Sequence, residues 1–229
     1  MPRIIIISSL VLYIVLLSCE LHMRMPSTEG EYFEGEIEYE LVYESLNPDV
    51  SSEEITKKST DRKILYFKGG NSMTENYIRD TLTSRTWYDR LSNTTYIQKL
   101  DSDTLYFYNS SNVDFIMEPL QEQTGEIILG HATRQITIAL KGKDNSNYTG
   151  SESQFIFHIA LDLPIDSIWF KDCLEFDYNK IMSLAPGMIL KEEDSIYGYR
   201  KLIKRATRIE HKPIELDLSI DSTKVLIEI

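Results

Sequence analysis

The alternation of residues 33–44 constrains the fold more than any other feature of this sequence. In the stretch FEGEIEYELVYE, the residues at one parity are apolar or glycine, and those between them are almost all glutamate. The first set is Phe33, Gly35, Ile37, Tyr39, Leu41 and Tyr43, and the second is Glu34, Glu36, Glu38, Glu40, Val42 and Glu44. Because successive side chains of a strand point to opposite faces, the pattern predicts a strand with one buried face and one acidic face.

The rest of the chain has the pattern of many short strands and no long helix. We expect strands at 63–68, 84–91, 94–100, 104–109, 115–119, 126–130, 133–140, 154–161, 197–209, 215–220 and 225–229. Whether 225–229 pairs behind 215–220 is left open. Short helices are expected at 51–54 and 177–184, and 76–82 fits either a helix or a strand. The spacing predicts a mainly β (α+β) fold in which an antiparallel sheet curls toward a barrel or a sandwich.

Residues 31–229 are expected to form a single domain. Hydrophobic residues make up 42% of the chain, which is enough for a core. This part contains no internal repeat and no linker rich in proline and serine. One domain is therefore the simplest organisation.

The N-terminus has the pattern of a secretory signal. Arg3 is followed by a largely apolar run over residues 4–17, which is shorter than the roughly 20 residues of a membrane-spanning helix. The run ends in Leu16-Leu17-Ser18-Cys19, which resembles the lipobox of bacterial lipoproteins. The resemblance implies a signal peptide at 1–18, lipidation of Cys19, and a tether at 19–30. An ordinary cleaved signal peptide and an uncleaved anchor are the alternatives.

These features predict a location and exclude one class of partner. The lipobox implies the cell envelope of a Gram-negative bacterium, with the chain anchored to the outer membrane through Cys19, on either the periplasmic or the surface face. The formal net charge is −12, so the anchor should be the lipid and not a basic patch. The same charge argues against nucleic acid as a partner.

A basic stretch near the C-terminus departs from this acidic background. The only acidic residue of the stretch 200–212 is Glu210, and its cations are Arg200, Lys201, Lys204, Arg205, Arg208 and Lys212. On a regular strand Arg200, Lys204 and Arg208 share one face, and neither face is cleanly apolar, so we expect a strand that lies near an edge of the sheet or bends across its rim. The cations either pair across strands with the glutamates of 34–44 or offer a surface to an anionic partner.

Sequence motifs for catalysis and metal binding are absent. The four His residues have no partners at zinc-site spacing, and there is no nucleophile elbow, phosphate-binding loop or dinucleotide fingerprint. Cys173 has acidic neighbours at Asp172, Glu175 and Asp177, which should raise the pKa of its thiol. We therefore predict no catalytic residue, no metal and no cofactor.

The stretch Leu184-Ala185-Pro186-Gly187-Met188-Ile189 resembles the motif of the GLPGLI family of bacterial envelope proteins. Pro186, Gly187 and Ile189 match that motif, whereas the residues at 184, 185 and 188 depart from it. The opening GEIEYELVY and the segment 128–133 resemble further parts of the family pattern. The resemblance implies a fold like that of the lipoprotein carriers LolA and LolB, an open half-barrel whose concave face is covered by short helices. It implies no reaction, because the family has no established activity.

Three functions are consistent with these observations. The first is a non-enzymatic lipoprotein that binds a lipid or another apolar ligand in the hollow of the curved sheet. The second is a structural or adaptor lipoprotein that binds another envelope protein through its surface, and the third is a hydrolase with an unrecognised carboxylate site. A hollow of several hundred Å³ lined by apolar side chains would favour the first.

We also expect a tight turn at Pro186-Gly187 with a positive φ at Gly187.

Overall fold

A computed structural model of the chain describes residues 32–111, 115–117, 120–142, 152–196, 199–221 and 223–229. All of them belong to one compact unit, Tyr32–Ile229. The predicted signal peptide at 1–18 and the tether at 19–30, including Cys19, lie outside the described residues.

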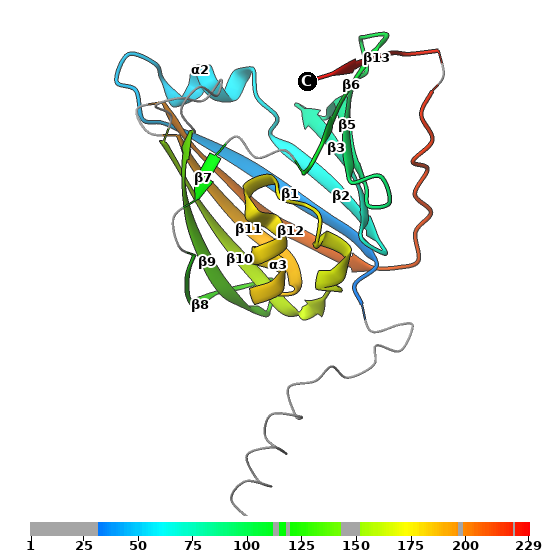
Figure 1. Cartoon of the computed structure of the whole chain (residues 1–229). Coiled ribbons are helices and arrows are strands. Elements are labelled where there is room, and N and C mark those ends of the chain that lie inside the picture. The colour runs from blue at the N-terminus through cyan, green and yellow to red at the C-terminus, as the bar shows by residue number, and fades with distance from the viewer. Residues whose placement is uncertain (1–31, 112–114, 118–119, 143–151, 197–198, 222) are drawn as a thin grey trace, which may run out of the picture. The chain divides into compact units, whose positions relative to one another are not determined.

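The first half of the unit is an antiparallel meander of six strands (Figure 1). Its strands are β1 (Gly35–Ser45), β2 (Arg62–Lys68), β3 (Asn71–Ile78), β4 (Thr81–Asp89), β5 (Thr94–Lys99) and β6 (Thr104–Asn109). The segment 76–82, which the sequence left open between a helix and a strand, spans the end of β3, a two-residue turn and the start of β4. Arg79 and Asp80 occupy this turn with φ of 49° and 64°, as a two-residue hairpin turn of the primed type requires.

The second half continues the same sheet from its other side. Its strands are β7 (Phe115–Met117), β8 (Gln121–Ile128), β9 (His131–Gly142), β10 (Glu152–Pro164), β11 (Gly187–Ile196) and β12 (Arg200–His211). The last of these pairs with the free side of β1, so β1 lies in the middle of the sheet between β2 and β12. Both β7 and β8 pair along one side of β9.

The expected curved, mainly β sheet is confirmed, and it does not close into a barrel (Figure 1). One pairing makes the sheet mixed: β13 (Val225–Glu228) lies parallel to β6. The expectation of a strand at 215–220 is wrong, and so is a pairing of 225–229 behind it. The strand expected at 126–130 begins earlier, because the polar stretch 121–125 also belongs to β8.

Short helices accompany the sheet. Helix α2 (Ser52–Lys57) begins with a capping box in which Ser51 accepts from the backbone N–H of Glu54 while the Glu54 carboxylate accepts from that of Ser51. Two 3-10 helices, η1 (Ser167–Phe170) and η2 (Glu175–Asp177), precede α3 (Tyr178–Leu184). Figure 1 shows α3 lying against one face of the sheet over β10 to β12. We call this face the inner face.

The core lies between the inner face and α3. The alternation of 33–44 is confirmed, because Ile37, Tyr39 and Leu41 of β1 are all buried in it. On the helix side, Ile181 and Met182 are fully buried against the sheet. Burying each such side chain contributes about 1.5–3 kcal/mol to the free energy of unfolding, so the helix is held by packing and not by its own propensity.

Candidate functional site

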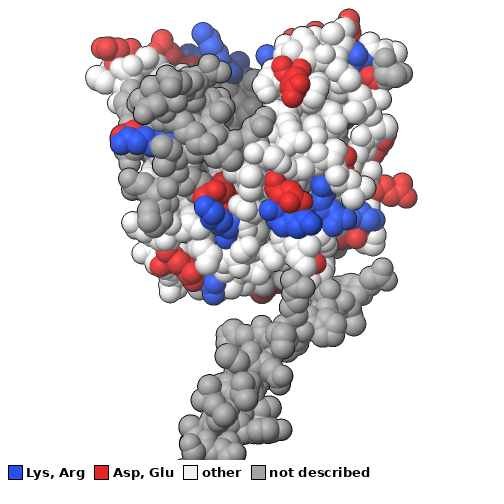
Figure 2. Space-filling model, in the orientation of Figure 1, with Lys and Arg blue, Asp and Glu red and all other residues white. Residues whose placement is uncertain are grey.

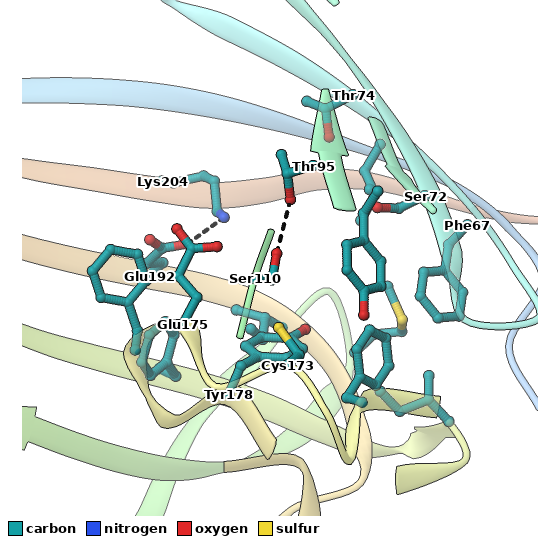
Figure 3. Close-up of a pocket in the computed structure, with 18 of the residues that line it drawn as sticks. Phe67, Ser72, Thr74, Thr95, Ser110, Cys173, Glu175, Tyr178, Glu192 and Lys204 are labelled. Atoms are coloured by element: carbon teal, nitrogen blue, oxygen red, sulfur yellow. Dashed lines mark hydrogen bonds and ion pairs between the residues drawn. The ribbon is translucent and has the colours of Figure 1, made fainter. Parts of the chain in front are cut away.

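The core is incomplete, because a pocket of about 340 Å³ opens between the inner face and the segment 165–178. We call it the central pocket. Residues of β1 to β5 and β10 to β12 form its wall on the sheet side, and residues of the 3-10 helices form the opposite wall (Figure 3). The apolar members of the lining are Leu65, Phe67, Phe155, Phe157, Ile165, Phe170, Phe176, Met188 and Ile189.

Aromatic rings from separate elements fix this wall. Phe170 of η1 stacks on Phe67 of β2 and on Tyr88 of β4, with ring centroids 6.3 Å and 6.0 Å apart. Phe155 lies 5.3 Å from Phe176 on the same measure. Stacked rings of this kind add to the burial of their area, so the 3-10 helices are attached to the sheet around the pocket by ring contacts.

A charged group occupies one part of the pocket lining. Lys63 of β2 lies opposite Tyr39 of β1, and Lys204 of β12 lies opposite Leu41. Since Tyr39 and Leu41 face the core, both lysines point to the inner face. Glu192 of β11 pairs in register with Lys204, and the two side chains form an ion pair (Figure 3).

The ionisation of these groups follows from their burial and their neighbours. Burial alone would raise the pKa of Glu192, but the charge and hydrogen bond of Lys204, with the charge of Lys63, bring that pKa below its ordinary value. Burial lowers the pKa of Lys63 to about 8, and repulsion from Lys204 acts in the same direction. Glu192 is thus ionised at neutral pH, and Lys63 is easily deprotonated.

The other polar side chains of the pocket are neutral or hydrogen-bonded. Burial raises the pKa of the Cys173 thiol to about 12, with the charge of Glu175 acting in the same direction, which agrees with the expectation from the sequence. Glu175 accepts a hydrogen bond from the Tyr108 hydroxyl at 3.1 Å, yet burial raises its pKa. Thr95 and Ser110 share a hydrogen bond of 3.2 Å. The Cys173 thiol is therefore not a ready nucleophile.

The three basic residues that the sequence predicted on one face of a strand lie on two different faces of the sheet. In the pairing of β12 with β1, Ala206 lies opposite Tyr39 and Arg208 opposite Glu38, so Thr207 is an extra residue in a bulge. The bulge reverses the parity, so Arg200 and Lys204 lie on the inner face and Arg208 on the outer face. The expectation of an edge strand is also wrong, because β12 lies between β1 and β11.

Cations on the outer face are paired with carboxylates. Arg208 contacts Glu36 at 2.6 Å and Glu38 at 3.2 Å, which is the expected pairing with the glutamates of 34–44. Arg205 contacts Glu126 of β8 at 3.0 Å. On the face seen in Figure 2, basic and acidic side chains likewise lie side by side. A surface for an anionic partner at Arg200, Lys204 and Arg208 stays a prediction.

The Pro186-Gly187 turn is present, but its geometry differs from the expected one. The N–H of Gly187 donates to the carbonyl of Ala185 at 2.9 Å, which places Pro186 at the centre of a three-residue turn. The prediction of a positive φ at Gly187 is wrong. Glycine is needed there because a Cβ would overlap the carbonyl oxygen of Ala160 and lie 2.8 Å from its carbon. Gly187 and Ile189 both line the central pocket.

Lys63 and Glu192 belong to no recognised sequence motif. The signal for Lys63 lies in the segment Lys63-Ile64-Leu65-Tyr66-Phe67, where the lysine shares a parity with the apolar Leu65 and Phe67. A lysine on the apolar face of a strand indicates either an edge or a pocket. Glu192 has no such signal, because its neighbours Lys191, Glu193 and Asp194 are all charged.

Two further classes of site find no support in the part of the chain that is described. No group of three or more His, Cys, Asp or Glu side chains there could hold a metal ion. None of its helices has the length and apolar character needed to cross a bilayer.

No family model matches the chain, and no curated protein matches it. The resemblance to the GLPGLI family and to the LolA and LolB carriers stays a prediction.

Proposed function

We propose that this chain is a non-enzymatic lipoprotein of the cell envelope that binds an amphiphilic ligand in the central pocket. The observation that carries the proposal is the pocket itself, whose volume of about 340 Å³ falls in the range of small-molecule sites. Its lining combines a large apolar area with a few polar groups, as ligand sites do. Attachment to the outer membrane through a lipid on Cys19 is part of the same proposal.

A neutral fluorescent probe tests the pocket directly. N-phenyl-1-naphthylamine gains fluorescence on entering an apolar site, so residues 32–229 should enhance it in a saturable way. Thr74 lines the pocket from β3 and is half-buried, so Thr74→Trp should fill the pocket and abolish the enhancement. Thr81 at the start of β4 is exposed, so Thr81→Trp is the matched control and should bind as wild type. Equal binding by both variants would contradict the proposal.

The adaptor function is a second candidate because of one observation. Strand β13 is at an end of the sheet, and Val225, Leu226 and Ile227 are 59%, 51% and 42% exposed. An exposed apolar edge strand is a template for pairing with a strand of another protein. Removal of 223–229 should then abolish copurification of an envelope protein without changing probe binding. Copurification that persists after this removal would contradict the adaptor function of β13.

A further inference from the structure

Lys63 differs from the other cations of the inner face. Lys204 is paired with Glu192, and Arg200 lies 3.9 Å from Asp194. Among the described residues the ammonium of Lys63 has no ion pair and no hydrogen-bond partner, although Lys63 is half-buried and lines the central pocket. A partly buried ammonium without a partner is costly. An anion in the pocket would remove that cost.

The charges around the pocket define what kind of anion fits. Lys63 and Lys204 carry two positive charges, and Glu192 carries one negative charge that Lys204 already neutralises. Glu175 also lines the pocket, and burial raises the pKa of its carboxyl. With Glu175 in its neutral form one positive charge is left over, which matches a group with a single negative charge. A carboxylate meets this requirement, whereas a phosphate monoester carries nearly two charges at neutral pH.

The surroundings of Lys63 define the rest of the ligand. Leu65 and Phe67 follow Lys63 on the same face of β2, and all three line the pocket. Alternate residues of a strand lie about 6.8 Å apart, so this row is about 14 Å long. It leads from the ammonium to the stacked rings of Phe67 and Phe170. A ligand held by Lys63 would therefore place an apolar chain along this row.

We propose that Lys63 binds the carboxylate of a single-chain amphiphile whose apolar chain lies along Leu65 and Phe67 in the central pocket. This inference rests on the proposed function, because it assigns a ligand class to the same pocket. It predicts selectivity by charge among ligands with identical tails. The groups that face Lys63 are Lys204 and Arg200 of β12, Glu192 of β11 and Tyr39 of β1. Lys204 and Arg200 are already paired with Glu192 and Asp194, so Lys63 is the cation left to hold a carboxylate.

The ionisation of Lys63 gives the inference a pH dependence. Its lowered pKa, about 8 in the empty pocket, means that the ammonium loses its charge not far above neutral pH. A bound carboxylate would raise that pKa, because an opposite charge favours the ammonium. Affinity for the carboxylate should therefore fall as the pH rises through 8, and affinity for a neutral ligand should not.

The test compares four ligands with the same twelve-carbon tail: dodecanoate, dodecanol, dodecyl phosphate and dodecyltrimethylammonium. Binding to residues 32–229 is measured by displacement of N-phenyl-1-naphthylamine below the micellar concentrations. Wild type should bind dodecanoate about tenfold more tightly than dodecanol, as expected of one charge-assisted contact worth roughly 1.4 kcal/mol. Dodecyl phosphate binding more tightly than dodecanoate would overturn the assignment to a carboxylate, and so would tight binding of the cation.

Variants separate this inference from the proposed function. Lys63→Met should lose the preference for dodecanoate and keep its affinity for dodecanol, whereas Lys63→Arg should retain the preference. Lys99 is an exposed lysine of β5, so Lys99→Met is the matched control. If Lys63→Met binds dodecanoate as wild type does, the headgroup site is wrong while the pocket stands. If wild type binds none of the four ligands and no probe, the proposed function itself fails.

Discussion

The hydroxyl of Tyr39 donates a hydrogen bond to the backbone carbonyl of Ile189, with 2.8 Å between the two oxygens. Tyr39 belongs to β1 and Ile189 to β11, so the bond spans the width of β12 on the inner face. Burial raises the pKa of Tyr39 far above its ordinary value, so the phenol stays protonated and remains a donor at any physiological pH. Both residues line the central pocket, and the bond thus holds its floor in shape.

Tyr39→Phe should lower the free energy of unfolding by about 1–2 kcal/mol, because it removes this hydrogen bond from the part-buried carbonyl of Ile189. In a domain of this size the Tm should fall by about 2–8 °C. Tyr199 is 51% exposed, so Tyr199→Phe is the control and should melt within a degree of wild type. Equal melting temperatures for the two variants would show that the bond does not stabilise the fold.

Gly187→Ala should destabilise the protein through a collision and not through backbone strain. The added Cβ would meet the carbonyl of Ala160, which forces β10 and β11 apart at the rim of the pocket. We expect a loss of about 1–3 kcal/mol in the free energy of unfolding, measured by urea denaturation. Gly69 has a φ of 56° and open space around it, so Gly69→Ala tests strain without collision. A smaller loss at Gly187 than at Gly69 would contradict this explanation.

The stability of the ligand-free protein should depend on pH through Lys63. Its pKa in the folded chain is about 8, below the value near 10.4 of an unfolded chain. Between these values the unfolded chain binds more protons, so this group makes stability rise with pH across that window. At pH 7 the charged Lys63 should cost about 1–3 kcal/mol.

Lys63→Met isolates that contribution. The variant should be more stable than wild type at pH 7, and its advantage should shrink between pH 8 and pH 10.5, measured by urea denaturation at each pH. Lys99→Met should show no such trend. An advantage that is independent of pH would mean that Lys63 has an ordinary pKa in the folded state.

Cys19→Ala tests the predicted anchor. If Cys19 carries the lipid, the variant should lose metabolic labelling by a radioactive fatty acid and leave the membrane fraction, because the acyl chains supply the membrane affinity. The matched control is Cys173→Ala, since Cys173 is buried in the fold. Labelling that persists in Cys19→Ala but is lost in Cys173→Ala would refute the lipobox interpretation.

The sequence predicted the elements whose pattern is local. The alternation of 33–44 marks β1 because one side of this strand is buried and the other carries glutamates. The short helix expected at 51–54 corresponds to α2, whose N-terminal signals likewise lie within a few residues. The parallel pairing of β13 with β6 could not be predicted in this way, because it joins residues more than 110 positions apart and nothing in the sequence of either strand specifies the other.

The candidate site was predictable only in part, for two physical reasons. A bulge adds one residue at Thr207, and parity counted along the sequence places Arg208 on the wrong side of it. The pocket is also made by segments far apart in the chain, such as β2 and η1, whose contact depends on the fold. Lys63 was within reach of sequence reasoning, because its parity matches that of Leu65 and Phe67.

The position of β1 in the middle of the sheet has a consequence for the order of folding. Each half of the sheet can form from neighbouring hairpins as the chain is synthesised. The seam between β1 and β12, in contrast, joins residues 35–45 to residues 200–211. Closing so long a loop costs entropy before its contacts compensate. We expect this seam to close last, so that Leu41→Ala should accelerate unfolding while leaving the refolding rate nearly unchanged in stopped-flow measurements. Until the seam closes, both sides of it are unpaired strand edges, and the nascent chain is then most exposed to aggregation.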